Sequence, residues 1–144
     1  MTHEAERAAI LATARTWIGT PFHGGASIKG VGVDCAQFVR AVAIESGARE
    51  IDETGAYSDQ WFMHRSGEQL INFAKRYTVE IAEADALPGD LVVYKIGRAF
   101  AHMAILTGSA TIIHAHKQVG CVCEALIESS DLAGRERRYF SLWG

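Results

Sequence analysis

The chain has 144 residues, of which 49% are hydrophobic, and a formal net charge of −3 at pH 7. This length and composition predict one folded domain, residues 1–144, with a sizeable core. Acidic and basic residues are interspersed, which argues against a nucleic-acid-binding protein because such a protein needs a basic patch, and no apolar run is long enough to span a membrane.

The first half of the chain is predicted to be helical. Apolar residues recur at spacings of three and four over residues 4–17, which predicts a helix. A glycine-rich loop follows at 22–33; it lacks the Gly-Lys-Ser/Thr of a phosphate-binding loop, and we expect no cofactor. Asp34 is predicted to cap a helix from Cys35 to about Ser46. Another helix is expected from about Asp59 to Lys75.

The second half is predicted to form an antiparallel sheet. Short β-rich runs separated by turn residues occur at Leu91–Tyr94, Ala101–Leu106, Ala110–His114 and Val119–Ala125. Residues 135–142 are a candidate for one more strand. Because the helices come first and the strands second, the pattern favours an α+β fold with a sheet of about five strands.

Cys35 is the candidate nucleophile. It is predicted to lie in the first turn of a helix, where free backbone N–H groups and the helix dipole favour a thiolate. A buried structural cysteine is the alternative. A cysteine nucleophile needs a base, and the candidates are His102, His114 and His116, which lie on or beside the predicted strands.

The register of one hairpin decides whether two of these histidines meet. With a three-residue loop at 107–109, His102 would lie opposite His114 on the same side of the sheet. With a two-residue loop at 108–109, the partner of His102 would be Ala115, and the two histidines would lie on opposite faces. Two core histidines with other partners are the alternative to a catalytic pair.

A metal site is a further alternative. His114-x-His116 and Cys121-x-Cys123 offer four ligands that zinc accepts, although paired zinc cysteines are usually two or more residues apart. We therefore expect no metal, and we expect both cysteines of the pair to be small apolar residues in a strand.

The cysteines and the N-terminus bear on the compartment. Three cysteines, an odd number with two of them too close for an ordinary disulfide, indicate reduced thiols. Glu4, Glu6 and Arg7 interrupt any signal-peptide pattern. We therefore expect synthesis in the cytoplasm without a leader.

Five stretches in this order resemble the NlpC/P60 family of cell-wall peptidases: Trp17–Phe22, Asp34–Val39, Pro88–Val92, His102–Ile105 and Ile113–Ala115. A cysteine at a helix start, followed by histidines on neighbouring strands, is similar to the permuted papain-like arrangement of that family. Residues 26–32 and the Ile-His-Ala-His run resemble its phage-type branch, which is found with tail or gene-transfer particles.

The resemblance implies hydrolysis of an amide bond in peptidoglycan stem peptides, in many relatives the bond between γ-D-glutamyl and a diamino acid. It implies that Cys35 is the nucleophile, His102 the base and His114 the group that orients His102. It also implies phage tail or gene-transfer particle proteins as partners, which would deliver the protein to the cell wall.

Four further residues are candidate substrate contacts. Phe22 stands where the family commonly has a tyrosine whose hydroxyl helps at the oxyanion or the substrate amine, so His23 or a water must replace it, or activity falls. Gln37 stands where relatives keep glycine and would narrow the cleft. Asp34 caps the helix and is a candidate for touching the substrate.

Two other functions stay open on the sequence. One is a structural tail component that keeps the fold with little activity, which Phe22 and Gln37 favour. The other is a thiol acyltransferase, because related permuted papain folds transfer acyl groups.

Overall fold

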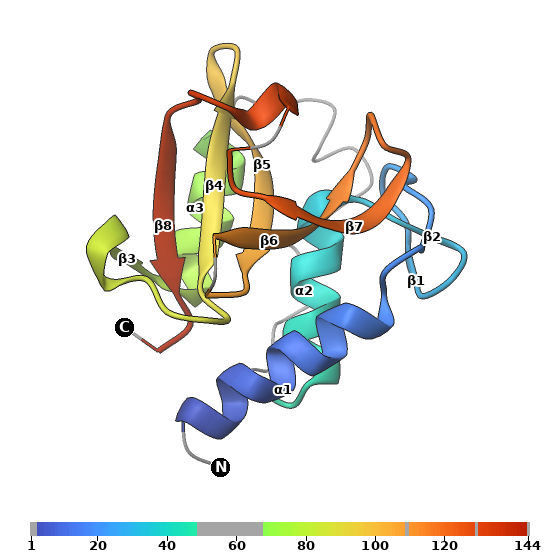
Figure 1. Ribbon diagram of the computed structural model, residues 1–144, viewed down its shortest axis with the longest axis horizontal. Coiled ribbons are helices and arrows are strands. Elements are labelled where there is room, and N and C mark those ends of the chain that lie inside the picture. The colour runs from blue at the N-terminus through green and yellow to red at the C-terminus, as the bar shows by residue number, and fades with distance from the viewer. Residues whose placement is uncertain (1–2, 49–67, 109, 129, 144) are drawn as a thin grey trace.

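The computed structural model describes residues 3–48, 68–108, 110–128 and 130–143 (Figure 1). The helices in these residues are α1 (His3–Thr16), α2 (Cys35–Glu45) and α3 (Glu68–Tyr77), with short 3₁₀ turns η1 (Glu83–Asp85) and η2 (Ser130–Leu132). The strands are β1 (Ser27–Ile28), β2 (Gly32–Val33), β3 (Val79–Ile81), β4 (Leu91–Ile96), β5 (Ala99–Leu106), β6 (Thr111–His116), β7 (Cys121–Leu126) and β8 (Arg137–Ser141). The α+β class predicted from the sequence is confirmed.

The main sheet has six antiparallel strands in the order β3-β8-β4-β5-β6-β7. The predicted meander is therefore β4 to β7, and the last predicted strand, β8, pairs with β4 rather than with β7. The prediction of about five strands missed β3, which has only three residues and little burial. It also missed β1 and β2, a two-residue pair inside the glycine-rich loop.

The helices bury one face of this sheet. α2 packs on β5 and β6, and α1 packs on α2 (Figure 1). Strands β4 to β6 carry apolar residues on both faces, and Leu132 of η2 packs with those of the second face. That second face also carries the three histidines that the sequence marked, so it needs polar partners there.

Helix α2 begins where the sequence predicted because Asp34 caps it. One carboxylate oxygen of Asp34 accepts the backbone N–H of Gln37 at 2.8 Å, and the other accepts that of Gly25 at 2.8 Å. A cap of this kind satisfies N–H groups that lack partners in the first turn. Asp34 therefore fixes the start of α2 and holds the glycine-rich loop against it, which sets the position of Cys35.

Only the last part of the predicted third helix lies in the described residues. The predicted helix from Asp59 to Lys75 matches α3 over Glu68–Lys75, and its first part lies outside the described residues.

None of the helices that the structure describes is both long and apolar enough to cross a membrane.

The loop between β5 and β6 differs from the prediction of 107–109. Leu106 pairs with Ile112, and the N–H of Thr107 donates to the carbonyl of Thr111 at 3.1 Å. The loop therefore begins after Thr107 and ends before Thr111, one residue later than predicted. Thr107 follows the end of β5 and extends the pairing toward Thr111, because its hydroxyl also bonds the Thr111 carbonyl, at 3.2 Å.

This loop position changes the predicted opposition of the histidines. Continued outward, the observed register places His102 opposite His116 rather than His114, a shift of two residues. A shift of two keeps every side chain on its original face, because side chains alternate along a strand. His102, His114 and His116 therefore share one side of the sheet, and His114 is reached diagonally.

Candidate active site

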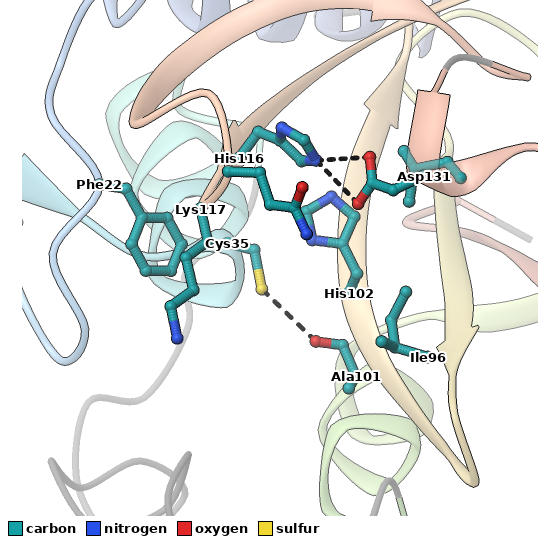
Figure 2. Close-up of a pocket in the computed structure, with 10 residues that line it drawn as sticks. Phe22, Cys35, Ile96, Ala101, His102, His116, Lys117 and Asp131 are labelled. Carbon is teal, nitrogen blue, oxygen red and sulfur yellow. Dashed lines mark hydrogen bonds and ion pairs between the residues drawn. The ribbon is translucent and has the colours of Figure 1, made fainter.

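A pocket of about 190 Å³ opens where the start of α2 meets strands β5 and β6 (Figure 2). Several separate segments contribute to its wall, among them Phe22 from the glycine-rich loop, Cys35 from α2, His102 from β5, His116 from β6 and Asp131 from η2. Lys117, which follows β6, also lines it. The structure thus brings a thiol, two imidazoles and one charged side chain of each sign into one pocket.

Cys35 is held as a buried, neutral thiol. It is the first residue of α2 and only 1% exposed, and its S–H donates to the carbonyl of Ala101 at 3.9 Å (Figure 2). Burial, assisted by the negative charge of Asp34, raises the pKa of the Cys35 thiol to about 12. The sequence led us to expect a thiolate at the helix N-terminus, and this expectation is wrong for the free protein. The loss of hydration on burial disfavours the thiolate more than the helix dipole favours it.

The raised pKa gives a testable prediction for the free protein. Alkylation requires the thiolate, so the rate at which iodoacetamide modifies Cys35 is expected to be low at pH 7 and to rise steeply above pH 9. The measurement is peptide mass spectrometry of a Cys121→Ser, Cys123→Ser background, so that only one thiol reacts. A fast, pH-independent reaction between pH 6 and 9 would show that Cys35 is already ionised.

A β-bulge shapes the strand that carries the candidate base. Tyr94 pairs with His102 but Lys95 pairs with Phe100, which leaves Ala101 as an extra residue on β5. Bulges commonly re-aim side chains beside functional sites. Here the carbonyl of the extra residue, Ala101, accepts the hydrogen bond from the Cys35 thiol, and His102 is the next residue along the strand.

His102 and His114 form a direct pair. His102 Nε2 lies 2.7 Å from His114 Nδ1, and the rings are edge-to-face with centroids 5.0 Å apart. Because Nε2 of His102 is held in this bond, Nδ1 is the nitrogen left to receive a proton from Cys35. Figure 2 shows the Cys35 sulfur and the His102 ring at the same pocket, and His114 is only 1% exposed.

Both members of this pair are neutral at pH 7. Burial, with smaller contributions from His114 and His116, holds the pKa of His102 well below its usual value of 6.5. Burial and then His116 lower the pKa of His114 to about 4, although Asp131 acts in the opposite direction. A neutral His102 is the form that can act as a base.

His116 has a different partner. Its Nε2 lies 3.0 and 3.2 Å from the two carboxylate oxygens of Asp131, and its ring stacks on that of His114 at 4.7 Å. His114 is therefore the residue bonded to His102, and His116 is not. Asp131 was missed by the sequence analysis because it lies in a short 3₁₀ turn with no motif of its own.

The structure brings one of the four predicted substrate contacts to the pocket. Phe22 lines it, whereas His23 is exposed and Gln37 is half-buried, and neither is among the residues that line it. Asp34 is fully buried, and both its oxygens are occupied by backbone N–H groups. Asp34 thus has a capping role, and the structure does not place it at the pocket surface.

The alternative metal ligands share a face without converging. Cys123 pairs with His114 and Cys121 with His116 across β6 and β7, so all four lie on one side of the sheet. In the described residues, however, no group of three or more His, Cys, Asp or Glu side chains is arranged to hold a metal ion. The imidazoles instead bond to one another and to Asp131.

Comparisons with known proteins find the NlpC/P60 family, which the sequence also resembles. The model of the NlpC/P60 family matches residues 19–133. The NlpC/p60 domain of the peptidoglycan hydrolase SagA is 24% identical, with a TM-score of 0.65 over 92% of this chain and 96% of that chain. A search of curated proteins found no match.

Two mycobacterial structures extend this comparison. The peptidoglycan hydrolase RipB from Mycobacterium tuberculosis is 20% identical, with a TM-score of 0.66 over 99% of this chain and 68% of that chain. RipD from the same organism, described as a non-catalytic NlpC/p60 domain protein adapted to peptidoglycan binding, is 15% identical, with a TM-score of 0.64 over 94% and 96%. Some similar solved chains are much longer, and this chain spans 42% and 39% of two of them. Likeness at these identities shows a shared fold.

Proposed function

This chain belongs to the NlpC/P60 family, and from that premise we propose that it is a cysteine peptidase that hydrolyses an amide bond in peptidoglycan stem peptides. The bond that we propose joins γ-D-glutamyl to a diamino acid. The observation that carries the proposal is the single pocket in which Cys35, at the start of α2, shares a wall with His102, itself bonded to His114.

The proposed reaction begins with proton transfer from Cys35 Sγ to Nδ1 of His102. The sulfur then attacks the amide carbonyl carbon, and the oxygen takes up negative charge. The N–H of Cys35 is the proposed oxyanion donor, because the helix cap engages the N–H of Gln37 instead. One such donor is worth about 3–4 kcal/mol in other enzymes.

The second half of the reaction returns the catalyst to its starting state. His102 gives its proton to the leaving amine, and the C–N bond breaks to leave a thioester on Cys35. Water, deprotonated by His102, then attacks the thioester and releases the free γ-carboxyl and the thiol. Throughout, His114 accepts the Nε2–H of His102, which keeps Nδ1 available.

The resting contact of the thiol fits a substrate-dependent mechanism. The S–H bond to Ala101 must break before the proton can pass to His102. A substrate that covers the pocket excludes water and strengthens the attraction between thiolate and imidazolium. The neutral resting pair then protects the thiol until a stem peptide is bound.

Incubation with purified muropeptides tests this function. We expect new fragments that end in γ-D-glutamate, identified by mass, and none with the Cys35→Ala variant. A mass gain on an added acceptor would indicate acyl transfer instead. Unchanged muropeptides would contradict the peptidase.

A second candidate function is peptidoglycan binding without cleavage. Two observations favour it: the Cys35 thiol is buried and neutral, and Phe22 has no hydroxyl to offer to the pocket. RipD, described as non-catalytic and adapted to peptidoglycan binding, shares the fold. Sedimentation of the protein with insoluble peptidoglycan, with no release of soluble fragments, would support this candidate.

The Phe22→Tyr variant tests the missing hydroxyl. Since Phe22 lines the pocket beside Cys35, a tyrosine places an O–H donor there. We expect kcat for muropeptide hydrolysis to rise by about 3- to 10-fold, less than a fully aligned oxyanion donor supplies. Phe22→Leu is the matched control, which removes the ring without adding a donor. If Phe22→Tyr is no faster than the natural protein, a hydroxyl at this position contributes nothing to the reaction.

A further inference from the structure

The three histidines and Asp131 form one continuous cluster at the pocket, whose wall includes His102, His116 and Asp131. His102 bonds His114, His114 stacks on His116, and His116 bonds Asp131. The proposed reaction uses only the first two of these residues. The last two are side chains with defined contacts and no role assigned so far.

We propose that Asp131 is a positioning residue for the catalytic pair. Its carboxylate bonds Nε2 of His116, whose ring stacks on that of His114, and its negative charge lies beside the pair, where it favours the imidazolium that forms when His102 takes the thiol proton. This inference rests on the proposed function, because it concerns the proton transfer of that reaction.

The tautomer of His116 follows from two contacts on opposite sides of its ring. The backbone N–H of Val119 donates to His116 Nδ1 at 3.3 Å, so Nδ1 must present a lone pair. The hydrogen of a neutral ring then lies on Nε2, which faces the carboxylate of Asp131 at 3.0 Å. These two contacts fix the orientation of the His116 ring, which stacks on that of His114.

The charge of Asp131 acts from the wall of the pocket. In the part of the chain that the structure describes, Asp131 is the one carboxylate that lines this pocket. Its side chain is 27% exposed, and a bound substrate would cover it. Removal of water would strengthen its attraction to a positive charge on His102, since water screens such interactions. The effect therefore grows when the reaction begins.

Other titratable and charged groups near His102 come from several elements: Cys35 on α2, Tyr94 on β4, His114 and His116 on β6, Lys117 after β6, and Arg137 on β8, over the Tyr94 ring. Burial raises the pKa of Tyr94, so it is neutral. Arg137 is paired with Glu128 at 2.7 Å. Lys117 carries a positive charge that opposes an imidazolium, and Asp131 is the group on the pocket wall that offsets it.

The Asp131→Asn variant separates charge from geometry. Asparagine keeps an oxygen that can accept the Nε2–H of His116, and it removes the negative charge. Asp85→Asn is the matched control, because Asp85 is an exposed carboxyl in η1 and does not line this pocket. Both variants lose one negative charge, so only a local effect can separate them.

The first measurement needs no substrate. Nitrogen-15 NMR of the histidine rings against pH is expected to show His116 with hydrogen on Nε2 in the natural protein. It is also expected to show a lower pKa for the His102–His114 pair in Asp131→Asn, with no change in Asp85→Asn. A natural protein in which His116 carries its only ring hydrogen on Nδ1 would overturn the proposal, even if the variant failed to fold. An unchanged pKa in a folded Asp131→Asn would do the same.

The second measurement is kcat against pH for muropeptide hydrolysis. We expect Asp131→Asn to lose about 3- to 10-fold at pH 7 and its acid limb to move to lower pH, because loss of a nearby negative charge disfavours the imidazolium. Lower activity with an unmoved acid limb would show a purely structural role and overturn the proposal. If the natural protein cleaves nothing, the proposed function fails, while the NMR result still decides the role of Asp131.

Discussion

Replacement of Cys35 by alanine is expected to reduce muropeptide hydrolysis by at least about 10,000-fold, to the level of the uncatalysed reaction plus binding effects. The reason is that the pocket holds one thiol. The other two cysteines lie on β7, partly exposed, and neither lines the pocket. The measurement is the rate of appearance of γ-D-glutamate-terminated fragments by mass spectrometry, with circular dichroism to verify that the variant is folded.

The matched control is the double variant Cys121→Ser, Cys123→Ser, which is expected to keep full activity. Alanine fits at position 35, because it is smaller than cysteine and is a good helix former. Activity that survives in a folded Cys35→Ala protein would rule out this sulfur as the nucleophile. Loss of activity in the folded double variant would mean that a cysteine on β7 contributes to the reaction.

Replacement of His114 by leucine is expected to lower kcat by about 100- to 1,000-fold. In the natural protein His114 accepts the Nε2–H of His102, which keeps Nδ1 of His102 unprotonated and ready for the thiol proton, and leucine cannot accept this bond. In the structure His114 Nδ1 lies 2.7 Å from His102 Nε2, and His114 is only 1% exposed. His114→Gln is expected to lose less, since the amide oxygen can accept the same N–H. The measurement is kcat and KM for each variant on one muropeptide.

His116→Gln is the control for this assignment. His116 bonds Asp131 rather than His102, so its replacement is expected to have a much smaller effect than His114→Leu. If His116→Gln lost more activity than His114→Leu, the orienting role would belong to His116. A His114→Leu protein as active as the natural one would mean that His102 needs no orienting partner.

The sequence was sufficient for most of the fold because the signals are local. Asp34 caps a helix that starts at Cys35, and four β-rich runs separated by turn residues form the meander β4 to β7. The short strand β3 was missed because three partly exposed residues carry no alternation. The position of β8 beside β4 was not predictable, because strand order depends on contacts far apart in the sequence.

The predicted register of the β5–β6 hairpin was wrong, but the predicted contact between His102 and His114 is present. The loop predicted at 107–109 begins one residue later, and His102 comes to lie opposite His116 instead of His114. The face was nevertheless right, because the shift is two residues. A side chain as long as histidine also reaches its diagonal neighbour across a sheet. The sequence could thus predict that His102 and His114 share a face and can meet, but it could not predict that they meet diagonally.

Two properties of the site needed the tertiary structure. Asp131 reaches the pocket only because η2 folds over the second face of the sheet, and nothing around it in the sequence marks it. The raised pKa of Cys35 follows from burial beneath Ala101 and beside Asp34, whereas its place at a helix start alone indicated the opposite. Delivery of the protein by a phage tail or gene-transfer particle stays a prediction from the sequence resemblance.

The most direct test of the central claim is to add hydroxylamine during muropeptide hydrolysis and identify the products by mass. A thioester on Cys35 would divide between water and hydroxylamine, so we expect a γ-hydroxamate product that increases with hydroxylamine at the expense of the free acid. Free acid alone at every hydroxylamine concentration, or no consumption of the muropeptide at all, would contradict nucleophilic catalysis by this thiol.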